Sequence, residues 1–164
     1  MNLPRTTYSV ILLGALVWCA AILLPAFLAN TSSSWLNEFV YRSFHPICHQ
    51  LPERSFHLFG ERLAVCSRCS SIYFAFLIGV IGYPFITPSL HHIRTPLRSV
   101  LVAALLPMLV DVALDFFGIH ASTFATRTMS GSLFGLVVPF FVLPAAIEGV
   151  QQLVPHNPIT IVQH

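Results

Sequence analysis

Four long apolar runs constrain what this chain can fold into. They cover residues 8–28, 70–86, 97–117 and 129–147, and a helix needs about 20 apolar residues to cross the hydrocarbon core of a bilayer. Because peptide groups in lipid must hydrogen-bond within the protein, helices are the expected form of these runs. The sequence therefore predicts an all-α integral membrane protein, a four-helix bundle that forms a single domain over residues 1–164.

The composition agrees with a membrane location. The chain is 55% hydrophobic and only 9% charged, whereas soluble domains carry about 25% charged residues. The first run is longer than the apolar region of a signal peptide, which has about 7–15 residues, so we expect it to be retained as a membrane helix. A net charge of +2 and the lack of a basic run argue against nucleic acid as a partner. The expected partners are membrane lipid and a lipid-like or small-molecule substrate.

The polar chemistry is concentrated in residues 45–73, which overlap the long connection 29–69 between the first two runs. This stretch contains three of the four cysteines and three of the eight histidines. Cys66 and Cys69 form a C-x-x-C motif where the second helix should begin, and the positive end of a helix dipole favours thiolate. Thiolate is both a nucleophile and a metal ligand, so this motif alone fits redox chemistry and metal binding equally.

Two further residues of this stretch favour a metal. Cys48 and His49, added to Cys66 and Cys69, supply a Cys3His set, which is a common tetrahedral shell for zinc. These four residues are the predicted metal ligands, with zinc as the expected cofactor, although soft ligands also suit copper or iron. A fully closed shell would be structural, and an open coordination position would allow the metal to activate water or polarise a substrate.

Three alternatives to a metal site remain at the level of sequence. Cys66 and Cys69 can act as the active pair of a membrane thiol–disulfide oxidoreductase. Such a relay usually needs a second pair, here Cys48 with Cys19, but Cys19 lies in the middle of the first run. The chain can instead be a small transporter or a membrane assembly partner whose loop binds another protein, or the cysteines can be free and purely structural.

The span count places further polar residues beside the cysteines. With four spans, the end of the long connection, the end of the third helix and the start of the fourth share one membrane face. Asp111 and Asp115 are four residues apart and therefore share one side of the third helix, and ionisable residues in a span usually face the bundle interior. Arg127 is the cation expected to neutralise them. We predict that these three residues form a catalytic pocket beside the metal; the alternative is an ion pair that fixes helix packing.

The segments CHQLPERSF and CSRCSSIY resemble an uncharacterised family of small bacterial and archaeal membrane proteins. Its members carry CHQ-x3-RSF and then C-x-R-C, followed by conserved blocks in later helices. The resemblance implies that this chain's family positions are Cys48, His49, Gln50, Arg54, Ser55, Cys66, Arg68, Cys69, Tyr73, Asp111, Arg127 and Gly131. Ser71 and Val112 replace glycines of the family pattern, and Asp115 replaces a glutamine. The resemblance implies a fold and a polar cluster, and it does not imply an activity. The expected location is the inner (plasma) membrane of a bacterial or archaeal cell.

Overall fold

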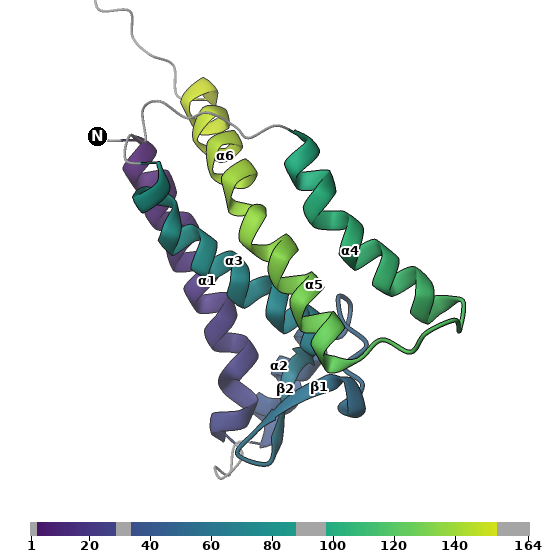
Figure 1. Cartoon of the computed structure of the whole chain (residues 1–164). Coiled ribbons are helices and arrows are strands. Elements are labelled where there is room, and N and C mark those ends of the chain that lie inside the picture. The colour runs from purple at the N-terminus through teal and green to yellow at the C-terminus, as the bar shows by residue number, and fades with distance from the viewer. Residues whose placement is uncertain (1–2, 29–33, 88–97, 154–164) are drawn as a thin grey trace, which may run out of the picture.

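Long helices lie side by side, and a small cap built from the connection between the first two spans covers one end of them (Figure 1). The computed structural model describes residues 3–28, 34–87 and 98–153. The long helices are α1 (Leu3–Leu28), α3 (Ser67–Ile86), α4 (Arg98–Phe116), α5 (Phe124–Val137) and α6 (Pro139–Leu153). Helix α3 packs most extensively on α5, whereas α4 packs mainly on α5 and buries only Ala104.

Four helical segments within the described residues are long and apolar enough to cross a membrane, which confirms the four predicted spans. They are Pro4–Leu28, Ser67–Ile86, Arg98–Phe116 and Phe124–Leu153. The fourth span is longer than the predicted 129–147 and is divided between α5 and α6. Pro139 causes the division, because it has no N–H to continue the hydrogen-bond ladder of α5.

The connection 29–69 is not a simple loop, so the all-α prediction was incomplete. Beyond residues 29–33, which lie outside the described residues, the cap contains α2 (Ser34–Phe44), the short 3-10 helix η1 (Pro52–Arg54) and the antiparallel strands β1 (Ser55–Leu58) and β2 (Glu61–Cys66). Phe59 and Gly60 join the strands with φ angles of 55° and 86°. Two consecutive left-handed residues are typical of a tight hairpin turn, because their twist matches that of paired strands.

Strand β2 is the buried part of the cap. Leu63, Ala64 and Val65 are all buried, and they pack with Ile22 of α1 and Phe44 of α2 in one apolar cluster. This strand leads directly into α3, with Cys66 as the residue before the helix. Burial of β2 therefore fixes where α3 begins, and it places the C-x-x-C motif at the boundary between cap and bundle.

Small residues bring α3 and α5 into close contact. A Cβ atom added at Gly131 would lie 2.8 Å from the carbonyl oxygen of Arg68. At Gly135 it would overlap the carbonyl oxygen of Ile72 and lie 2.9 Å from the Cβ atom of Ala75. Helices in lipid associate through close packing rather than through the hydrophobic effect. The spacing of four between the two glycines therefore marks the contact that joins the second and fourth spans.

We predict that Gly135→Ala destabilises the protein by roughly 1–3 kcal/mol, because the added methyl group forces α3 and α5 apart. The control is Gly82→Ala on α3, since a Cβ atom there meets nothing within 4 Å. Thermal unfolding of both variants in the same detergent is the measurement. Equal melting temperatures for the two variants would contradict the proposed contact.

Candidate metal centre

Three cysteines from different parts of the cap meet at one point. The Sγ atoms of Cys48, Cys66 and Cys69 all lie within 4.8 Å of one another. Cys48 follows α2, Cys66 ends β2, and Cys69 lies in the first turn of α3. Tetrahedral zinc with Zn–S distances of about 2.3 Å needs sulfur atoms roughly 3.8 Å apart, so the three thiols are close enough to share one ion.

The surroundings of Cys66 favour thiolate. The backbone N–H of Cys66 donates a hydrogen bond to the Sγ atom of Cys48 at 3.2 Å. The pKa of Cys66 lies far below its usual value, because the thiols of Cys48 and Cys69 hydrogen-bond to its sulfur. Both effects act at the N-terminus of α3, where the helix dipole adds to them. Deprotonated sulfur is the form that binds metal, so the local electrostatics match the predicted chemistry.

Gln50 holds the Cys48 segment in place. Its side-chain amide is buried and donates hydrogen bonds of 2.8 Å to the carbonyl oxygens of Tyr41 and Ala64. The backbone carbonyl oxygen of Gln50 accepts a 2.8 Å hydrogen bond from Arg62. The guanidinium carbon of Arg62 lies 4.6 Å from the ring centroid of Tyr41. These contacts tie α2 and β2 to the turn that carries Cys48. The resemblance had marked Gln50, but nothing in the residue pattern predicted this role.

The predicted fourth ligand, His49, stands apart from the sulfurs. Its side chain is exposed and lines the cavity beside the cysteines, and the metal-ligating group found among the described residues contains the three cysteines alone. His45 and His57, the other histidines of residues 45–73, are exposed as well. Coordination by His49 therefore stays a prediction, and the structure brings together three cysteines that could bind a metal.

A cavity of about 390 Å³ opens beside the sulfurs. The three cysteines and His49 line it together with three arginines, Arg54, Arg68 and Arg127. Arg68 sits between the two cysteines of the C-x-x-C motif, so α3 itself brings a guanidinium next to the thiols. The cavity thus combines metal-ligating sulfur with a wall that is rich in hydrogen-bond donors.

The two aspartates of α4 contact these arginines. Asp111 forms an ion pair with Arg68, a partner that the sequence had not indicated. Asp115 lies 3.1 Å from the Nη1 atom of Arg54 and 3.7 Å from the Nη2 atom of Arg127. The structure therefore brings Asp111, Asp115 and Arg127 to the same end of the bundle as the cysteines, as the span count implied. Their catalytic role stays a prediction.

Arg127 is the most buried of the three arginines, with a side chain only 7% exposed. Its Nε atom donates a 2.6 Å hydrogen bond to the hydroxyl of Ser122, and the backbone N–H of Ser122 donates to Asp115 at 3.1 Å. Thr123 and Thr126 form a capping box at the start of α5. The short segment before α5 therefore connects the aspartate of α4 with the arginine of α5.

A known protein family matches the part of the chain that carries these residues. Residues 48–141 match the family described as "Predicted membrane protein (DUF2085)". The chain belongs to this family. The match begins at Cys48 and includes the clustered cysteines, the aspartates and Arg127, which confirms the resemblance seen in the sequence.

Relatives of this DUF2085 protein occur in archaea. The chain is 37% identical over 146 residues to an uncharacterised protein of Methanocaldococcus jannaschii. The aligned region covers 86% of this chain and 93% of that protein. It is 34% identical over 90 residues to an uncharacterised protein of Methanothermobacter thermautotrophicus, which covers 54% of this chain and 77% of that protein. No solved structure matches the chain. The chain is thus a membrane protein with archaeal relatives, and its function has to be inferred from the site.

We predict that Asp111→Asn lowers the free energy of unfolding by about 3 kcal/mol, because it leaves the largely buried Arg68 without its counter-charge. The control is Glu38→Gln, which removes an exposed ion pair with Arg42 on the cap and should change stability by less than about 1 kcal/mol. Denaturant unfolding in detergent measures both. A loss at Glu38 as large as that at Asp111 would contradict the structural role of the buried pair.

Proposed function

We propose that the protein is a membrane zinc protein whose ion is bound by Cys48, Cys66 and Cys69 and keeps its fourth coordination position open to the cavity. This proposal is supported by the three sulfur atoms that lie close together beside a cavity, with His49 outside their group. Structural zinc sites use four protein ligands, whereas catalytic sites use three and leave one position for water or substrate. The three-sulfur set therefore favours a reactive site over a purely structural one.

The proposed activity is that of a metalloenzyme for a lipid-like or small-molecule substrate. When bound, zinc supplies a Lewis acid that polarises an oxygen ligand or lowers the pKa of a bound water. The chain's own groups bind and orient the substrate, with Arg68 and Arg127 donating hydrogen bonds from the cavity wall. Asp111 and Asp115 act as positioning residues, because each contacts an arginine that lines the cavity.

A second function, thiol–disulfide exchange by Cys66 and Cys69, is favoured by the lowered pKa of Cys66. Against it stands the position of Cys19. Cys19 is buried in α1 and its thiol contacts the carbonyl oxygen of Tyr73 at 3.5 Å, outside the three-sulfur group. A relay would therefore lack the second pair that passes electrons onward. The metal and redox proposals differ in what the purified protein contains, which makes them separable.

The metal proposal predicts about one zinc ion per chain in protein purified in detergent without added metal. Cys48→Ser should lose the ion, because two thiolates and a serine hydroxyl bind zinc much more weakly. His49→Ala should keep it, and Cys19→Ser is the matched control because it removes a thiol that lies outside the group. Elemental analysis of the four proteins, normalised to protein concentration, is the measurement.

Three results would count against this proposal. Loss of zinc in His49→Ala would show a closed Cys3His shell and contradict the open position. Equal zinc content in wild type and Cys48→Ser would refute the ligand assignment. A wild type without metal, in which mass spectrometry finds a disulfide between Cys66 and Cys69, would favour thiol–disulfide exchange instead.

A further inference from the structure

We propose that the cavity beside the three cysteines binds the anionic oxygen group, a phosphate or carboxylate, of an amphiphilic ligand. This proposal rests on the proposed function, which makes this cavity the reactive site. It adds the chemical class of the substrate. It is carried by the arginines of the wall, whose hydrogen-bond donors are only partly used within the protein.

The buried guanidinium of Arg127 does not use all of its hydrogen-bond donors within the protein. Its Nε atom donates to Ser122, whereas its Nη2 atom lies 3.7 Å from the nearest oxygen of Asp115, which is too far for a hydrogen bond. Within the described part of the chain, the Nε atom of Arg68 is buried and has no hydrogen-bond partner. Buried donors are nearly always satisfied in folded proteins, so the guanidinium groups of these two cavity-lining arginines can take an acceptor from outside the chain.

An oxyanion is the acceptor that fits these guanidinium donors. Arg54, Arg68 and Arg127 line the cavity, whereas Asp111 and Asp115 are not among its lining residues. Guanidinium groups present several N–H donors in one plane and match phosphate or carboxylate oxygens in pairs. Three arginines and two aspartates leave one positive charge, which offsets the one negative charge of zinc with three thiolates. Unused donors, rather than net charge, therefore select the ligand.

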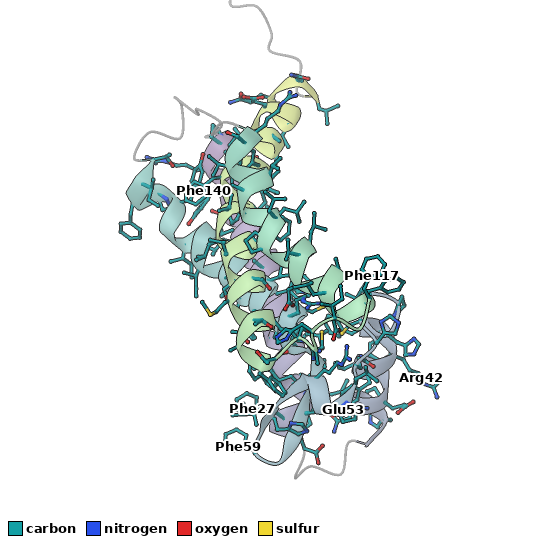
Figure 2. All side chains as sticks on the ribbon, turned by 45° about the vertical axis from the view of Figure 1, so that its right-hand side comes forward. Phe27, Arg42, Glu53, Phe59, Phe117 and Phe140 are labelled. Atoms are coloured by element: carbon teal, nitrogen blue, oxygen red, sulfur yellow. The ribbon has the colours of Figure 1, made fainter. Side chains whose placement is uncertain are left out.

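The rim of the cavity favours an apolar portion on the same ligand. Ile47 and Leu51 line it and are 50% and 40% exposed. The cavity lies where α3 and α5 begin, at the end of the spans. Phe27 contacts Phe59 with ring centroids 5.6 Å apart, and both exposed rings lie at the cap end of the molecule (Figure 2). Trp35 of the cap is 71% exposed, and tryptophan is enriched at the headgroup level of a bilayer.

The test measures binding of three probes to the full-length protein in a neutral detergent. The probes are inorganic phosphate, dioleoyl phosphatidic acid and the uncharged dioleoylglycerol, titrated by calorimetry. We expect phosphatidic acid, inorganic phosphate or both to bind, and dioleoylglycerol to bind weakly or not at all. Binding of phosphatidic acid alone identifies a lipid headgroup as the source of the oxyanion, whereas equal binding of both supports the oxyanion site and contradicts an amphiphilic ligand.

Variants connect this binding to the cavity. Arg54→Gln should weaken it about tenfold or more, and the side chain of Arg54 is 44% exposed, so the variant is expected to fold. Arg127→Lys should also weaken it, because lysine keeps the charge but lacks the planar pair of donors. The matched control is Arg42→Gln, which removes an exposed arginine on α2 that does not line the cavity.

The inference is overturned if neither anionic probe binds, or if Arg54→Gln and Arg127→Lys bind as tightly as wild type. Zinc content measured in the same samples separates this result from the proposed function. Zinc without anion binding overturns the inference alone. Arginine-dependent anion binding by a protein without zinc supports the inference and contradicts the metal proposal.

Discussion

The direct junction of β2 and α3 determines where the reactive groups lie. Strand β2 is buried against α1 and α2, and α3 begins at the next residue. The first N–H groups of a helix have no partner within the helix, and here that electropositive end lies beside Cys66 and Cys69. Cys48 joins them because the N–H of Cys66 donates to its sulfur. Packing of an apolar strand thus brings three thiols together at the N-terminus of α3.

The same junction organises the charges of the site. Arg68 follows Cys66 by two residues and pairs with Asp111, and Asp115 contacts Arg54 and Arg127 from the next turn of α4. Helix α4 buries little surface against the bundle, so these ion pairs are its main polar attachment at the site end. Charges near the hydrocarbon are costly unless paired. The aspartates therefore serve both to attach α4 and to hold the arginines at the cavity wall.

Part of this arrangement was accessible from the sequence. Hydropathy and length located the four spans, and their number alone placed Cys66, Asp111 and Arg127 at one end. The hairpin was missed because its strands are short and the Phe59–Gly60 turn is a weak signal. The pairing of Arg68 with Asp111 and the role of Gln50 depend on side-chain directions that only the tertiary structure sets. His49 is exposed, lines the same cavity and lies outside the group of three sulfurs, and its coordination of a metal stays a prediction.

We propose a metal that is bound by three thiolates and keeps one exchangeable coordination position. X-ray absorption at the zinc edge of the purified wild-type protein tests it most directly, because it counts sulfur and lighter ligands separately. We expect three sulfur atoms at about 2.3 Å and one oxygen at about 2.0–2.2 Å, with the oxygen shell altered when inorganic phosphate or phosphatidic acid is added. A first shell of nitrogen and oxygen alone, or one with fewer than three sulfur atoms, would contradict it.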